Sequence, residues 1–106
     1  MTTFIKVPHC TSMTELRAHI DRLDDQIVAL IAERSAFVAQ AARIKSRPDQ
    51  IVDNARIEFI VERVCENARG AGAPEPVMEA TYRAMIAAFI EFERKEFMRL
   101  REESAS

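Results

Sequence analysis

Three basic side chains in the first part of the chain occupy positions where a helix should be apolar. The run from Met13 to Lys45 contains neither Gly nor Pro, and its apolar residues recur at helical spacing. Arg34 falls on the line of apolar residues seven apart, and Arg17 and Lys45 fall on the adjacent line. An unpaired charge in such a seam costs several kcal/mol. We therefore expect an anionic group to meet these cations, from the protein or from a ligand.

The spacing of the three cations predicts how they can meet a small anion. Arg34 and Lys45 lie on one helical face roughly 16 Å apart, so their long side chains could converge on one ligand. Arg17 lies roughly 25 Å from Arg34 on the same rod and cannot reach that ligand within one chain. Antiparallel packing of two copies would bring Arg17 of one copy to Arg34 of the other, which predicts two equivalent sites per dimer.

Further charged residues in the second half of the chain could complete such a site. Arg56 would add a fixed cation, and Asp53, one turn earlier, could hold it or accept a hydrogen bond from a ligand hydroxyl. Glu93 interrupts an apolar stripe between Phe89 and Phe97. The structural alternative for Arg56 is a surface ion pair with Asp53 or Glu58.

Structural alternatives also exist for the other charges. Arg17 and Lys45 lie near the ends of the predicted helix, where long side chains reach solvent. Glu93 could be an internal ion-pair partner of Arg34, and the pattern alone does not reject that pairing.

The elements that must position these residues are three helices, so the fold class is all-α. The first helix begins near Ser12 or Thr14 as N-cap and ends before Pro48. With roughly 33 residues it is about 50 Å long, which exceeds the diameter of a compact monomer of this size. This very long helix must protrude or lie against a second chain.

The second and third helices are separated by a short loop. Asp53 is the expected N-cap of a helix that runs to about Arg69, where Gly70 supplies the stop. Pro76 suits the first turn of the third helix. These boundaries predict a flexible arm over residues 1–12, one helical domain over residues 13–101 and a frayed tail over residues 102–106.

Composition excludes several classes of function. With 106 residues, 48% hydrophobic and 30% charged, the chain is one globular domain, and two Gly and four Pro favour long helices. A net charge of −2 excludes an extended basic surface for nucleic acid. Cys10 and Cys65 lie far apart without His or Cys at ligand spacing, so neither a disulfide nor a metal site is expected. No signal-peptide pattern or membrane span is visible, which predicts a cytoplasmic protein.

The order of these residues resembles the all-helical chorismate mutase family over residues 13–97. The resemblance rests on the series Leu16-Arg17, Ile20-Asp21, Leu23-Asp24, Ile27, Glu33-Arg34, Lys45, Asp53 and Arg56. The Cys10-Thr11 arm and the segment from Tyr82 to Ile90 are also similar to the isochorismate pyruvate-lyases that share this fold. The resemblance implies an intertwined antiparallel homodimer of three-helix protomers, with no metal or organic cofactor.

The resemblance also implies roles for individual residues. Arg34, together with Arg17 from the other chain, would bind the two carboxylates of the substrate. Lys45 would donate to the ether oxygen whose bond breaks. The other substrate-binding positions are Asp53 and Arg56 at the ring end, Ile57, Phe89, Ile90 and Glu93.

Glu93 and Ile57 mark departures within the family. Glu93 stands where bacterial relatives usually have a Gln that donates to the ether oxygen, and fungal mutases have Glu there. An ionised carboxylate cannot donate a hydrogen bond, so we expect Glu93 to act in its protonated form. Ile57 stands where many mutases have a Glu that contacts the substrate hydroxyl, and the lyases are apolar there too.

The function implied first is a chorismate mutase, an isomerase of the shikimate pathway whose product prephenate serves aromatic amino-acid biosynthesis. The alternative is an isochorismate pyruvate-lyase that yields salicylate and pyruvate. A second alternative of another class is a non-enzymatic helical dimerisation module with charged pairs in its seam. The loop from Ser46 to Val52, next to Lys45, is expected to gate the pocket.

Overall fold

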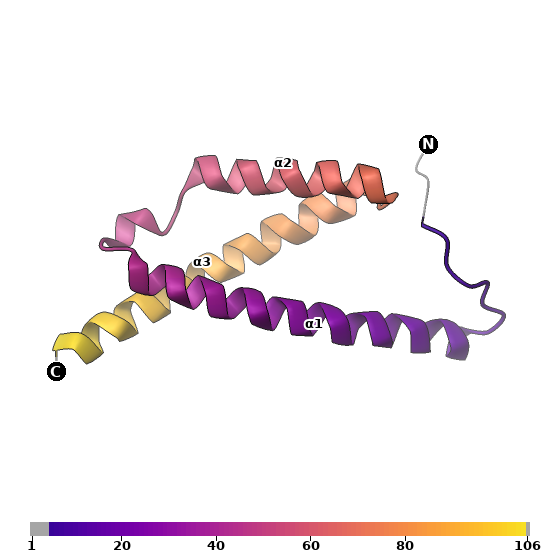
Figure 1. Ribbon diagram of the computed structural model, residues 1–106, viewed down its shortest axis with the longest axis horizontal. Helices are drawn as coiled ribbons and strands as arrows, with labels where there is room; N and C mark the ends of the chain where they lie inside the picture. Colours follow the sequence, from indigo (N-terminus) through magenta and orange to yellow (C-terminus); the bar gives the residue numbers. More distant parts are fainter. Residues whose placement is uncertain (1–4, 106) are drawn as a thin grey trace.

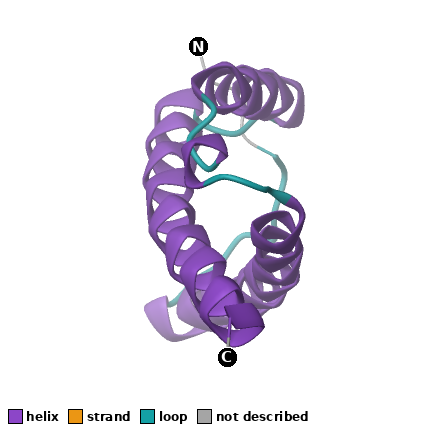
Figure 2. Ribbon diagram, turned by 90° about the vertical axis from the view of Figure 1, so that its left-hand side faces the viewer, coloured by secondary structure: helices purple, strands orange, loops and turns teal. Residues whose placement is uncertain are grey.

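The computed structural model describes residues 5–105 and is helical throughout its regular parts. In chain order it contains α1 (Met13–Ile44), the short 3-10 helix η1 (Pro48–Gln50), α2 (Asn54–Ala71) and α3 (Glu75–Ala105) (Figure 1). Figure 2 shows no strand in this part of the chain, so the predicted all-α class is confirmed. Residues 1–4 of the predicted arm and Ser106 of the predicted tail lie outside the described residues.

The ends of α1 are fixed by the residues expected from the sequence. The Ser12 side chain accepts a hydrogen bond from the backbone N–H of Glu15 at 3.1 Å, as an N-cap does. Lys45 is the C-cap, and its N–H donates to the carbonyl of Ala41 at 2.9 Å. The 32 residues between the caps give a rod of about 48 Å in a molecule of 59 × 29 × 15 Å.

Helix α3 joins the other two helices. It packs against both α1 and α2, and it crosses α1 near the C-terminal end of that helix (Figure 1). Asp53 caps α2 as predicted, with its Oδ1 accepting from the N–H of Arg56 at 3.0 Å. Pro76 lies in the first turn of α3, also as predicted.

Two predicted helix ends were wrong. Helix α2 continues through Gly70 to Ala71 and is capped by Gly72, whose φ of 75° lies in the left-handed region. The cap therefore falls on the glycine that adopts positive φ, and Gly70 is an ordinary helical residue. Helix α3 runs to Ala105, so residues 102–105 extend the helix and do not form a frayed tail.

The apolar core of the described chain is small. It consists of two clusters of buried residues, one formed by Ala42, Ile51 and Phe97, the other by Val61, Cys65 and Ile86. Among the described residues, no helix combines the length and apolar character that crossing a membrane requires. The clusters leave many large apolar side chains of α1 uncovered, including Ile20, Leu23, Ile27, Val28 and Leu30, which are 45–66% exposed.

Candidate active site

A cavity of about 490 Å³ lies among the helices, and all of the predicted site residues except Arg17 line it. The predicted residues that line it are Arg34, Lys45, Asp53, Arg56, Ile57, Phe89, Ile90 and Glu93. Sequence reasoning did not assign the remaining lining residues to the site: Phe37, Val38, Ala41, Gln50, Ile51, Ile60 and Ile86. The cavity therefore combines three cations and two carboxylates with an apolar wall.

Lys45 and Glu93 form an ion pair at this cavity. The Lys45 Nζ lies 2.7 Å from Glu93 Oε2, and the residue Glu93 is only 7% exposed. The predicted alternative that Glu93 pairs with Arg34 was wrong, because α3 brings Glu93 to the C-terminal end of α1, eleven residues beyond Arg34. A buried carboxylate is thereby satisfied, and the ammonium group is held at the cavity wall.

Arg34 reaches the cavity by another route. Its guanidinium carbon lies 4.9 Å from the centroid of the Phe89 ring, a cation–π arrangement that leaves the guanidinium edge available for hydrogen bonds. Within residues 5–105, no carboxylate forms an ion pair with Arg34. An aromatic face orients this cation but does not neutralise it, so Arg34 can still bind an anion.

The start of α2 supplies the third cation. The Asp53 carboxylate accepts from the backbone N–H of Arg56, so it holds the backbone of that residue through the helix cap. The Arg56 guanidinium lies over the ring of Phe59 at 5.0 Å. Neither of the ion pairs that the sequence suggested for Arg56, with Asp53 or with Glu58, is among the described contacts. Asp53 and Arg56 both line the cavity.

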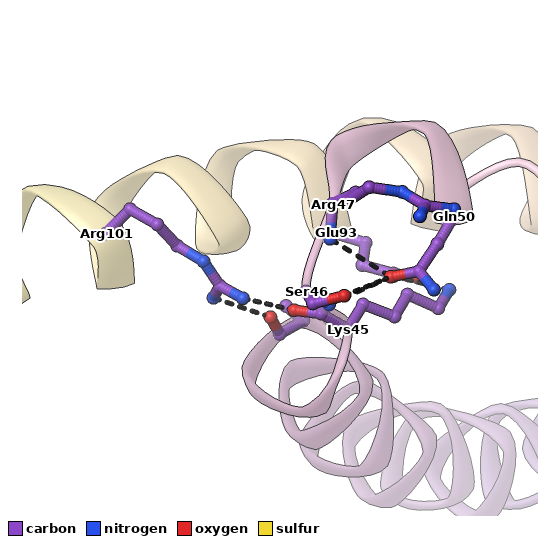
Figure 3. A network of polar contacts seen from close by, with 7 residues as sticks. Lys45, Ser46, Arg47, Gln50, Glu93 and Arg101 are labelled. Carbon is purple, nitrogen blue, oxygen red and sulfur yellow. Dashed lines mark hydrogen bonds and ion pairs between the residues drawn. The ribbon is translucent and has the colours of Figure 1, made fainter.

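Gln50 is the polar lining residue that sequence reasoning missed. Its Oε1 accepts hydrogen bonds from the backbone N–H groups of Ser46 at 2.8 Å and Arg47 at 3.0 Å (Figure 3). These bonds close the turn that carries the chain from Lys45 into η1. The available signal was a polar side chain three residues after Arg47, the spacing of a capping box, within the loop predicted to gate the pocket.

Arg17 is not brought to this cavity within one chain. It is exposed on the N-terminal half of α1, roughly 25 Å along the helix from Arg34. The single chain therefore assembles every predicted site residue but one, and the missing one is the residue that the resemblance assigns to a second chain.

The N-terminal arm forms a separate feature at the start of α1. Cys10, Glu15 and His19 each bring one potential metal-ligand atom to within 4.8 Å of the others. Cys10 lies nine residues from His19 in the sequence, a spacing that did not predict this cluster. Glu15 already accepts from the Thr11 N–H at 3.2 Å, and three protein ligands fall short of the four in a structural zinc site.

Two comparisons with known proteins bear on the family of this chain. The family model for chorismate mutase type II matches residues 16–94. The chain is 30% identical over 87 residues to a bifunctional chorismate mutase/prephenate dehydratase of Aquifex aeolicus (strain VF5). That match covers 78% of this chain and 24% of the relative, so the chain spans about a quarter of that protein's length.

Proposed function

This chain belongs to the chorismate mutase type II family, and on that premise we propose that it converts chorismate to prephenate. The observation that carries the proposal is that Arg34, Lys45 and Arg56 line one and the same cavity, which also has an apolar wall. A dicarboxylate with a hydrophobic ring complements such a surface, because fixed cations meet its charges while the wall excludes water.

The proposed chemistry requires neither a nucleophile nor a general base. The Claisen rearrangement is unimolecular, so the protein must hold the substrate in its compact diaxial conformer. It must also stabilise the negative charge that develops on the ether oxygen as the carbon–oxygen bond breaks. Preorganised cations perform both tasks.

We assign these tasks to individual side chains. Arg34 binds one substrate carboxylate, helped by the Phe89 ring that orients its guanidinium. Lys45 donates to the ether oxygen from the cavity wall. Asp53 and Arg56 bind the ring end, where Arg56 is oriented by the N-terminal turn of α2.

Glu93 holds Lys45 in the unliganded site, and we propose a second role for it in the complex. A dianionic substrate adds negative charge beside this buried carboxyl and thereby favours its protonated form. The protonated carboxyl can then donate to the ether oxygen beside Lys45.

The proposed enzyme is a homodimer with two equivalent sites. The exposed apolar residues of α1 border a second groove, of about 350 Å³, between α1 and α3. Its lining is apolar apart from Arg34, Thr81 and Tyr82; the other lining residues are Ile27, Leu30, Ile31, Val77, Met78 and Met85. Antiparallel docking of a second α1 would cover this surface and carry Arg17 of that copy to the cavity with Arg34.

Ile57 supports a second candidate, an isochorismate pyruvate-lyase. It lines the cavity directly after Arg56, where a Glu would hydrogen-bond to the ring hydroxyl of chorismate. The position of that hydroxyl distinguishes the two substrates, and an apolar wall does not select for it. The same cations would bind the same carboxylates in the elimination of pyruvate.

Ligand-induced thermal stabilisation tests the anion site directly. A dicarboxylate mimic of the bicyclic transition state should raise the melting temperature of the protein. At a concentration a hundredfold above Kd, the bound mimic adds about 2.7 kcal/mol to the free energy of unfolding. The rise should be lost in Arg34→Ala and kept in Arg43→Ala, a matched control on the exposed face of α1. A non-enzymatic dimerisation module would show no shift in any of the three proteins.

A further inference from the structure

One face of α3 contacts the C-terminal end of α1 at three successive helical turns. Glu93, Phe97 and Arg101 are spaced by four residues and therefore lie along one side of the helix. Glu93 pairs with the Lys45 side chain, and Phe97 packs in the buried cluster with Ala42. Arg101 completes the row, and the proposed chemistry gives it no role.

Arg101 binds the backbone of α1 at its last turn. One guanidinium nitrogen donates to the carbonyl of Ala42 at 2.9 Å, and the other donates to the carbonyl of Lys45 (Figure 3). The guanidinium carbon also lies 3.7 Å from the centroid of the Phe97 ring. The planar fork is thus fixed on one face by an aromatic ring, and its two edges bind carbonyl groups of the neighbouring helix.

These contacts satisfy groups that the helix itself leaves unpaired. The last four carbonyls of an α-helix have no intrahelical donor, and the C-terminal end carries partial negative charge. Ala42 has no exposed surface, so water does not replace Arg101 easily at its carbonyl. A cation with two donors is therefore well suited to this end of α1.

We infer that Arg101 is a positioning residue for Lys45, an inference that rests on the proposed function. Lys45 is held at two points by α3, since Glu93 binds its ammonium group and Arg101 binds its backbone carbonyl. Fixing the backbone limits the positions that the ammonium can take when substrate displaces Glu93. Arg101 lies beyond residue 94, where the family match ends, so this part of α3 supports the site from outside the matched region.

The test compares three single variants of the full chain with the unchanged protein. Arg101→Gln removes the charge and one of the two paired donors, and Arg101→Lys keeps the charge but reaches only one carbonyl at a time. Arg99→Gln is the matched control, because Arg99 is an exposed cation on the same helix and pairs only with Glu96 and Glu103 of α3 among the described contacts.

Two measurements separate positioning from general stabilisation. Hydrogen exchange at the backbone amides of Lys45, Ser46, Arg47 and Gln50 reports how firmly the end of α1 is held, and it needs no substrate. Steady-state kinetics with chorismate and isochorismate report kcat and KM separately. We expect exchange at these amides to be at least about tenfold faster in Arg101→Gln, with kcat about tenfold lower and KM within about twofold. Arg101→Lys should be intermediate, and Arg99→Gln should match the unchanged protein.

Each outcome decides a different point. Unchanged exchange in Arg101→Gln would overturn the anchoring, and faster exchange with unchanged kcat would overturn the catalytic consequence. If Arg99→Gln shows the same faster exchange and the same lower kcat, the effect comes from the loss of a positive charge on α3, and the positioning role of Arg101 is overturned. If the unchanged protein converts neither substrate, the proposed function fails, while the exchange result still decides whether Arg101 anchors Lys45.

Discussion

The two halves of α1 carry the same apolar pattern but meet different surroundings. Near the C-terminal end, Ala42 has no exposed surface and packs in a buried cluster with Phe97 of α3 and with Ile51, the residue after η1. In the N-terminal half, Ile20 and Ile27 remain 47% and 50% exposed. Periodicity therefore predicts which face of a helix is apolar, whereas the neighbouring elements determine whether that face is buried. The covered half holds most of the residues of the proposed anion site, and the uncovered half holds Arg17 and the surface proposed for a second copy.

The largest expected effect comes from inactivating each half of α1 in a different variant and then mixing the two variant proteins in equal amounts. Lys45→Ala and Arg17→Ala should each lower kcat/KM by about 10²–10³-fold, because each removes a cation that acts on the substrate. After the two inactive proteins are mixed and allowed to exchange subunits, about a quarter of the normal activity should return, since each mixed dimer contains one intact site.

The control for this experiment is each variant carried through the same exchange alone, which should stay inactive. Absence of recovery in a mixture that demonstrably contains mixed dimers would mean that Arg17 and Lys45 do not serve a shared site.

A charge placed on the uncovered half should break the assembly. Ile27→Glu would bury an unpaired carboxylate in the proposed dimer and destabilise it by several kcal/mol, yielding monomers by light scattering. Val28→Glu is the matched control, because Val28 is 66% exposed and points about 100° away around the helix. If α1 instead protrudes freely, both variants should behave as ordinary surface substitutions, within about 0.5 kcal/mol.

The next prediction concerns the covered half of α1 and the proposed role of Glu93 there. Glu93→Ala removes both the partner of Lys45 and the proposed donor to the ether oxygen, so kcat should fall by about tenfold. Glu93→Gln keeps a hydrogen-bond donor at this position, so it should retain more activity than Glu93→Ala in the same steady-state assay. Equal losses in the two variants would mean that no donor at this position serves the reaction.

The smallest effect is expected far from the site, where α2 meets α3 at the surface. Arg83 donates to both carboxylate oxygens of Glu58 at 3.0 and 3.1 Å, and this lowers the pKa of Glu58. A lowered pKa stabilises the fold above the pKa of the unfolded chain, and the contribution disappears as the pH falls through the folded value. Arg83→Gln should therefore lower the melting temperature by a few degrees at pH 7.

The difference between the Arg83→Gln and unchanged proteins should shrink below about pH 4, as measured by thermal melts across the pH range. A difference that persists undiminished in acid would assign the stabilisation to packing of the Arg83 stem.

The sequence was sufficient to predict features that depend on local chemistry. Ser12 and Asp53 cap their helices as expected, because a short polar side chain before an apolar run satisfies the first free N–H groups. Nearly all of the site residues were predicted to share a surface and do share a cavity. Gly72 was missed because two glycines two residues apart offer the same stop signal, and only the backbone conformation distinguishes them.

What could not be predicted depends on how the helices cross. Glu93 was considered as a partner of Arg34, but the crossing of α3 over α1 determines that it meets Lys45. The same crossing brings Arg101, the last residue of the predicted helical domain, to the end of α1. A polar side chain that binds a neighbouring helix produces no periodic pattern in the sequence of its own helix.

The most direct test of the proposed function is product analysis of the purified protein. It should be incubated separately with chorismate and isochorismate, and prephenate, salicylate and pyruvate followed by chromatography. We predict prephenate from chorismate as the main product, with loss of conversion in Arg34→Ala. Predominant salicylate and pyruvate from isochorismate would instead establish the lyase and identify Ile57 as the residue that relaxes selection for the hydroxyl. No conversion of either substrate by a folded dimer would contradict the assignment of the cavity as an active site.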